Sequence, residues 1–292
     1  MMKIREFKNS IEFKNDGQLS LFFLGTGGAF SKKYFQNNAL IIKGNSHILI
    51  DCGTLCPLAF SFFNSDITQV RNFLLTHNHA DHIGGMEEIA LVNMYGTKQV
   101  PNILITDEFK KILWNESLKG GLKIKGENSA KPTMSFDDYF HQIKPKKIKK
   151  SPRPFYEAEI GDINLKIFRT KHIFTDKNNW KNSYYSIGVL IDNKIIYTGD
   201  SQADKELIEW LTSEFNIECI FHDCQFGHNA VHTDYEELLK ILTPDLRKKT
   251  YLCHYSDNAD QQKDRVMQDG FAGCVTRGVY YDCEQADSSK LL

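Results

Sequence analysis

The sequence predicts an α/β protein in which two β-sheets are covered by outer helices. Short apolar strands separated by glycine turns fill the first third of the chain, and further strands fill the last half. Segments with helical apolar spacing are interleaved with strands in both halves, which favours two covered sheets over one parallel sheet. The composition agrees, because 41% of the 292 residues are hydrophobic and 25% are charged, as in globular proteins.

The first third predicts four strands and one helix. Alternating or continuous apolar residues bounded by turns give the strands, and apolar residues three or four apart give the helix. The expected strands are Leu19–Leu24, Ala39–Lys43, Ile48–Asp51 and Phe73–Thr76, and the expected helix is Met86–Met94.

The rest of the chain divides into an irregular stretch and a second set of elements. Residues 110–154 combine glycines, prolines and a basic run, and we expect an irregular insertion with some helix within a single domain spanning residues 1–292. The expected strands are Ile163–Phe168, Ser186–Ile191, Lys194–Thr198, Glu218–Phe221 and Thr250–Cys253; the expected helices are Lys205–Leu211 and Tyr235–Leu242, the latter capped by Thr233.

Charge and cysteine usage exclude several classes of protein. The 36 Lys and Arg residues balance 37 Asp and Glu residues, so the chain is not basic throughout. No apolar run is long enough to span a bilayer, and the charged N-terminal segment does not resemble a secretory signal. The seven cysteines contain no CxxC pair and are interpreted as reduced thiols. We therefore expect a cytoplasmic protein with no membrane partner.

Three of the ten histidines fall within one short motif, His77-Asn78-His79-Ala80-Asp81-His82. The motif follows an expected strand, and His77 and His79 point the same way in an extended segment. Two imidazoles on one side can bind one divalent metal, while Asp81 and His82 turn toward a second position. Imidazole and carboxylate ligands suit zinc and similar metals.

Three further candidate ligands each follow an expected apolar strand. They are His172, Asp200 and His254. Each alone is weak evidence for a metal site. Together with the four ligand-type residues of the histidine-rich motif, these three give a set of seven candidate ligands.

These motifs resemble those of the metallo-β-lactamase fold superfamily, and within it ribonuclease Z and its phosphodiesterase relatives. Leu24-Gly25-Thr26-Gly27-Gly28 is similar to their opening loop, and Asp51-Cys52-Gly53 to their aspartate-glycine turn. The resemblance implies a four-layer αββα sandwich with two divalent ions, zinc with manganese as the alternative. It implies one ion on His77, His79 and His172, the other on Asp81, His82 and His254, and Asp200 bridging them.

The resemblance also implies catalytic residues. The segment His222-Asp223 followed by His232-Thr233 is similar to the ribonuclease Z segment whose acid and second histidine act on the leaving oxygen. Here the acid is Asp223, one methylene shorter than the family's glutamate. A hydroxide shared by the ions would attack phosphorus, His232 oriented by Asp223 would protonate the leaving oxygen, and Asp81 would orient the hydroxide.

The segment between His172 and Asp200 is too short for the tRNA-binding arm of ribonuclease Z. We therefore expect a phosphodiesterase for small anionic nucleotides. The similarity to armless cyclic-nucleotide phosphodiesterases and phage anti-Pycsar enzymes implies that it opens the ring of a cyclic substrate. Such relatives pair, so a homodimer is expected, with Phe60, Phe62 and Phe63 as possible contributors.

Three alternatives stay open. The first is an RNA endonuclease that uses the basic run Lys144, Lys146, Lys147, Lys149, Lys150 and Arg153 in place of an arm. The second is a thioester or lactone hydrolase of the same fold. The third is a metal-bound interaction protein without turnover, which the complete ligand set disfavours.

Overall fold

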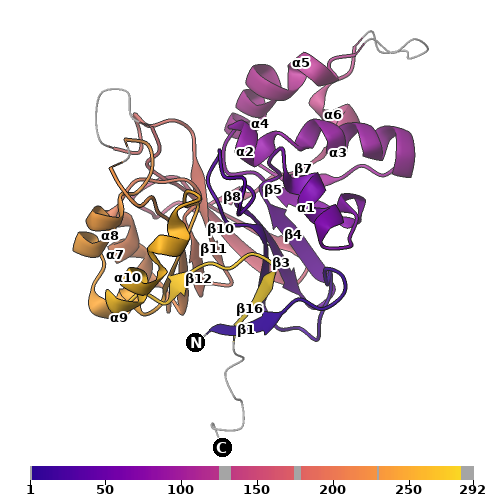
Figure 1. Ribbon diagram of the computed structural model, residues 1–292. Helices are drawn as coiled ribbons and strands as arrows, with labels where there is room; N and C mark the ends of the chain where they lie inside the picture. The colour runs from indigo at the N-terminus through magenta and orange to yellow at the C-terminus, as the bar shows by residue number, and fades with distance from the viewer. Residues whose placement is uncertain (1, 125–132, 174–178, 229, 284–292) are drawn as a thin grey trace, which may run out of the picture.

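Two mixed β-sheets stack face to face in the computed structural model, which describes residues 2–124, 133–173, 179–228 and 230–283. Helices lie on the outer face of each sheet, so the four-layer α/β arrangement expected from the sequence is confirmed (Figure 1). Within the described residues, no helix is long and apolar enough to cross a membrane.

The first sheet has the strand order β1-β16-β2-β3-β4-β5-β6-β7. Its strands are β1 Met2–Glu6, β16 Val279–Cys283, β2 Ser20–Gly25, β3 Asn38–Lys43, β4 Ser46–Ile50, β5 Asn72–Leu74, β6 Asn102–Leu104 and β7 His141–Ile143. Its helices are α1 Cys56–Phe62, α2 Ala80–Ile83, α3 Met86–Val92, α4 Asp107–Leu113, α5 Lys119–Leu122 and α6 Phe136–Tyr139, with short turns of other helix types at Ile67–Gln69, Asn93–Thr97 and Trp114–Leu118.

The second sheet has the strand order β15-β14-β13-β12-β11-β10-β9-β8. Its strands are β15 Gly273–Cys274, β14 Thr250–Cys253, β13 Cys219–Asp223, β12 Ile195–Tyr197, β11 Ile187–Ile191, β10 Ile163–Arg169, β9 Phe155–Ile160 and β8 Lys146–Lys147. Its helices are α7 Lys205–Glu214, α8 Tyr235–Ile241, α9 Pro244–Arg247 and α10 Lys263–Gln268, after the short helical turn Ala259–Gln261.

Alternation along the strands builds the core on both faces of the second sheet. On β11, Val189 and Ile191 belong to the large cluster between the sheets, whereas Leu190 belongs to the cluster beneath α7 and α8. Successive side chains of a strand point to opposite faces, so a strand buried on both sides is apolar throughout. This explains why the second half of the sequence shows continuous apolar runs.

Residues 110–154 are more regular than expected, although residues 125–132 lie outside the described part of the chain. They contain helical turns, and they supply β7 and β8, which are edge strands of the two sheets. These strands have only three and two residues, too short for a periodic signal in the sequence. A second correction concerns α8: its N-cap is Asp234, which accepts a hydrogen bond from the Glu236 amide, whereas the predicted cap Thr233 donates to the carbonyl of Ser201.

The basic run does not form one free cationic surface. Lys144 is paired with Asp107, and the Nζ atom of Lys146 lies 4.0 Å from Glu157. Arg153 is buried, and its Nη1 atom lies 2.8 Å from Asp204 Oδ2. Arg153 therefore compensates the buried charge of Asp204 and is not part of a surface that could bind phosphates.

Replacing Arg153 with Met should lower the free energy of unfolding by about 3 kcal/mol, because Asp204 would keep a buried charge without its main partner. We expect the low end of the usual range because Lys171 Nζ remains 3.3 Å from Asp204 Oδ1. Urea unfolding monitored by circular dichroism measures the change. The control is Lys147→Met at an exposed position of β8, which should shift stability by less than about 0.5 kcal/mol. Equal losses in the two variants would contradict this interpretation.

Candidate metal centre

The predicted ligands lie where several strands end. Strands β4 and β5 are parallel in the first sheet, and β12, β13 and β14 are parallel in the second, so their carboxyl ends meet at common edges. His77 and His79 follow β5, and Asp81 and His82 lie in the short helix α2. His172, Asp200 and His254 follow β10, β12 and β14 respectively, so segments far apart in the sequence converge.

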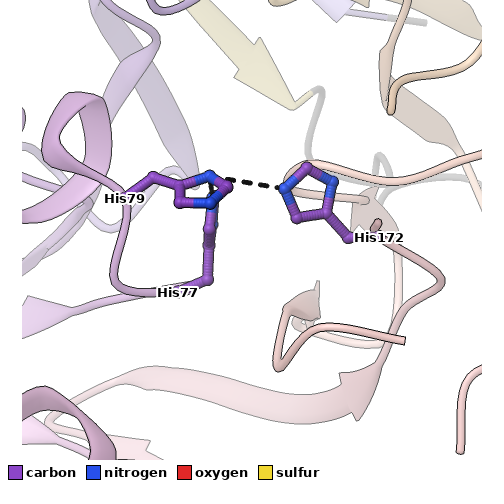
Figure 2. Close-up of side chains that lie close together, drawn as sticks. All are labelled: His77, His79 and His172. Atoms are coloured by element: carbon purple, nitrogen blue, oxygen red, sulfur yellow. Dashed lines mark hydrogen bonds between the residues drawn. The ribbon is translucent and has the colours of Figure 1, made fainter. Parts of the chain in front are cut away.

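Three imidazoles form the first group, and their ring nitrogens face one another (Figure 2). His77 Nε2 lies 2.9 Å from His79 Nδ1, which lies 3.5 Å from His172 Nε2. Burial holds the pKa of His77 well below its usual value and lowers the pKa of His172 to about 4. Both rings are therefore neutral at physiological pH, the form in which an imidazole nitrogen can bind a metal.

The second group contains two carboxylates and two imidazoles. His82 Nε2 lies 3.1 Å from Asp81 Oδ2 and 3.2 Å from Asp200 Oδ2. His254 Nε2 lies 3.3 Å from Asp81 Oδ2 and 3.3 Å from Asp200 Oδ1. Burial raises the pKa of Asp200, but the charges of His254 and His82 outweigh it and hold that pKa well below the usual range. The group thus contains two ionised carboxylates, which the three-histidine group lacks.

Asp200 lies between the two groups. Its Oδ2 atom is 3.7 Å from His77 Nε2 in the first group, and both its oxygens contact imidazoles of the second. His82 Nε2 and Asp200 Oδ1 are buried and form no well-aligned hydrogen bond with any described residue, although the polar atoms named above lie close to them. Buried polar atoms without partners are costly, and a cation between converging donors would satisfy them. The donor set therefore fits two divalent ions, and the seven individual ligand roles remain predictions.

Asp51 orients one of these ligands. Its Oδ2 atom lies 2.7 Å from His82 Nδ1, while its Oδ1 atom accepts a hydrogen bond from the Thr76 amide at 2.7 Å. Asp51 has a left-handed backbone with φ of 62°. A carboxylate on the far nitrogen fixes the ring so that Nε2 faces the metal position.

His254 is held in a strained conformation. Its φ of 60° is unfavourable for a residue other than glycine, and such strain persists only where neighbours enforce it. The His254 amide donates to the Thr26 carbonyl at 2.8 Å, and the His254 carbonyl accepts from Gln225 Nε2. Gly28 packs against it, because a Cβ atom there would lie 3.2 Å from the His254 carbonyl oxygen.

Asp223 and His232 form a pair beside the second group. His232 Nδ1 lies 2.8 Å from Asp223 Oδ2, so the shorter acid still reaches the histidine. Burial lowers the pKa of His232, but the Asp223 charge and hydrogen bond outweigh it and raise that pKa above its usual value. Asp223 Oδ1 also lies 3.5 Å from His254 Nδ1. The pair therefore contacts a predicted ligand while His232 retains access to solvent.

Sequence reasoning missed Tyr184. Its ring is stacked on His79 with centroids 4.9 Å apart, and its hydroxyl donates to Asn78 Oδ1 at 2.7 Å. A single tyrosine after a loop has no spacing that points to a metal site. Residues 174–178, which come shortly before Tyr184 in the sequence, lie outside the described residues.

The fold and this group of histidines and aspartates define a protein of metallo-β-lactamase fold. The structure resembles the metallo-β-lactamase fold protein YhfI from Bacillus subtilis with a TM-score of 0.66 and 16% identity, over 91% of this chain and 100% of that one. The family described as anti-Pycsar protein Apyc1 matches residues 19–281, and the chain belongs to this family.

Individual members share about a third of their residues with this chain. The anti-Pycsar protein Apyc1 of Paenibacillus sp. (strain J14) is 35% identical over 243 residues, which cover 83% of this chain and 91% of that protein. The anti-Pycsar protein Apyc1 of Bacillus phage 010DV004 is 32% identical over 248 residues, with 83% and 91% covered. The resemblance inferred from the motifs is therefore confirmed at the level of the family.

Metal analysis after reconstitution with zinc or manganese should find close to two ions per chain. Replacing Asp200 with Asn should lower the content of both sites together, because a neutral amide is a poor bridge between two cations. Replacing His254 with Ala should lower mainly the metal content of the second site, which Asp81, His82 and His254 are predicted to form. Elemental analysis after gel filtration reports the stoichiometry, and Asp66→Asn on an exposed turn is a matched control. One ion or none in the wild-type protein would count against the ligand assignment.

Proposed function

We propose that the protein is a binuclear metal-dependent phosphodiesterase that hydrolyses small anionic nucleotides, with cyclic nucleotides as the preferred class. The observation that carries the proposal is the His232–Asp223 pair, which lies beside two groups of metal-type ligands. Ligands alone suit several hydrolytic reactions, whereas an oriented histidine near them suits expulsion of a poor alkoxide leaving group.

Two divalent ions, zinc with manganese as the alternative, would lower the pKa of a water molecule and neutralise phosphate charge when bound. His77, His79 and His172 would hold one ion, and Asp81, His82 and His254 the other, with Asp200 shared. The imidazole-rich set favours zinc. The burial of most of these side chains excludes competing water from the ligands.

The chain's own residues then account for the movement of protons. The water oxygen forms a bond to phosphorus as the bond from phosphorus to the sugar oxygen breaks. Asp81, which lines the cavity beside the ligands, orients the attacking water. His232 carries a proton on Nε2 while Asp223 holds its Nδ1 atom, and Nε2 delivers that proton to the departing sugar oxygen. The proton that the attacking water loses passes to solvent, and a solvent proton replaces the one that His232 has delivered. A cyclic diester and one water molecule thus become a monoester, and no other reactant is required.

The size of the cavity supports a small substrate. A cavity of about 500 Å³ lies over Asp81, Asp200 and His232, within the usual range for small-ligand sites. The two relatives described above are named anti-Pycsar proteins, which favours a small nucleotide over tRNA. The alternative RNA endonuclease is weaker, because Lys144 and Arg153 of the basic run have acidic partners.

All seven cysteines are free, and six of them are buried. Free thiols in this number suit a reducing compartment, and we propose that the protein acts in the cytoplasm.

Replacing His232 with Ala should slow hydrolysis of a cyclic nucleotide by ~10²–10⁴-fold, which is the usual contribution of general acid catalysis. Both ions should stay bound. The defect should shrink with a nitrophenyl phosphodiester, because that leaving group departs without a proton. Steady-state kinetics with both substrates and metal analysis of the same samples provide the measurement. His141→Ala, at an exposed position of β7, is the control. Equal slowing on both substrates with loss of metal would show that His232 only supports the ligands.

We also propose that the protein is a homodimer. Of the three aromatic residues suggested by the sequence, Phe60 and Phe63 are buried in the core, whereas Phe62 is 59% exposed on α1 beside the exposed Leu58. Only Phe62 can therefore contribute to a contact with a second copy. Apolar side chains of this size on one short helix are candidates for burial on association.

Light scattering at micromolar concentration should give twice the mass of the 33.6 kDa chain. The double change Leu58→Ser and Phe62→Ser should shift the mass toward that of one chain, because it removes apolar area from the contact. Met267→Ser, at another exposed apolar position on α10, is a matched control that should leave the mass unchanged. A monomer mass for the wild-type protein would contradict the proposal.

A further inference from the structure

Two cavities open beside the metal centre. The cavity of about 500 Å³ is lined by the predicted ligands His79, Asp81 and Asp200. A smaller cavity of about 220 Å³ is lined by Gln225, Ser256 and Asp257, together with the ligand His254. His232 and Phe30 line both cavities. Phe30 is therefore within the same cavities as the histidine that we propose to meet the leaving oxygen.

Phe30 is the most exposed large apolar side chain among the described residues, at 90%. An aromatic ring with this exposure has open faces, and leaving it in water forgoes the free energy of its burial. Its place in the lining of both cavities distinguishes this ring from other exposed apolar side chains. The ring is thus available to a flat partner that enters from solvent.

The loop that carries Phe30 is fixed at several points. The Ser31 amide donates to the Gly28 carbonyl at 3.0 Å, which closes a tight turn around Ala29 and Phe30. Ser31 Oγ donates to Asp257 Oδ1 at 2.5 Å, and the Gly28 amide donates to the Tyr255 carbonyl at 2.9 Å. Because the backbone is held on both sides, contact with a ligand would cost little ordering of the chain.

The polar side chains of the smaller cavity are already engaged within the protein. Gln225 Nε2 donates to the His254 carbonyl, and its Oε1 atom accepts from Ser256 Oγ at 2.7 Å. Asp257 accepts from Ser31 Oγ and from the Lys32 and Lys33 amides. These groups are poorly placed to read the hydrogen-bonding edge of a base. The remaining way for this cavity to hold a base is contact between the base and the Phe30 ring.

We propose that Phe30 is the platform on which the base of the nucleotide substrate stacks. The proposal rests on the nucleotide phosphodiesterase function proposed above and specifies how that site holds its substrate. Every nucleobase has a π-face, so stacking tolerates purines and pyrimidines alike. The Phe30 ring can therefore contact either class of base while the phosphodiester lies at the metal centre.

Replacing Phe30 with Ala should raise the KM for cyclic nucleotides about 5- to 150-fold, the effect expected for loss of one stacked base. The rise should appear with all four bases, with kcat and metal content little changed. Phe30→Trp should restore the wild-type KM because it restores a flat ring. A cyclic ribose phosphate that lacks a base should be hydrolysed equally by the wild-type and Ala variants.

The control is Tyr95→Ala, which removes another ring, 65% exposed, outside the lining of both cavities, and should leave the KM unchanged. Light scattering of each variant tests whether Phe30 instead packs against a second copy. A wild-type enzyme that hydrolyses cyclic nucleotides, with an Ala variant of unchanged KM, would overturn the stacking role and leave the proposed function standing. No turnover of any cyclic nucleotide by the metal-loaded wild-type protein would overturn both.

Discussion

The burial of the Asp200 carboxylate between two groups of imidazoles is the constraint on which the site depends. A buried carboxylate is tolerated only where opposite charge or hydrogen-bond donors compensate it. Its two oxygens contact His82 and His254, and one also approaches His77. The strands that supply these contacts come from both sheets, so the sandwich must close before the charge is compensated. The same arrangement requires a strained backbone at His254 and leaves little room for a side chain at position 28, where Gly28 packs against the His254 carbonyl.

Much of the site could be predicted because its signals are local in sequence. His77, His79, Asp81 and His82 lie within one short segment after an apolar strand, and the later ligands each follow a strand of their own. Tyr184 and Phe30 carried no such signal, since their roles depend on which loops the fold brings together. The edge strands β7 and β8 were missed for a related reason. Their pairing is decided by partners distant in the chain rather than by their own propensity.

Asp223 contacts His232 although its side chain is one methylene shorter than the glutamate of ribonuclease Z. Asp223 is the final residue of β13, and its amide is held by Thr198 Oγ1 at 3.1 Å, while its Oδ2 atom also accepts from the Ser201 amide at 2.9 Å. These bonds fix the carboxylate within 2.8 Å of His232. The sequence does not fix that distance, because it depends on where the backbone of β13 ends and on where the fold places His232.

The position of β16 has a consequence for biosynthesis. This strand, Val279–Cys283, pairs with β1 on one side and β2 on the other, so segments from opposite ends of the chain are interleaved in one sheet. During synthesis, β1 has no partner strand and one edge of β2 stays unpaired until residue 283 has left the ribosome. Exposed strand edges promote association with other chains. Completion of the first sheet therefore has to wait for a late segment of the chain, and the unpaired edge of β2 is open to association during that interval.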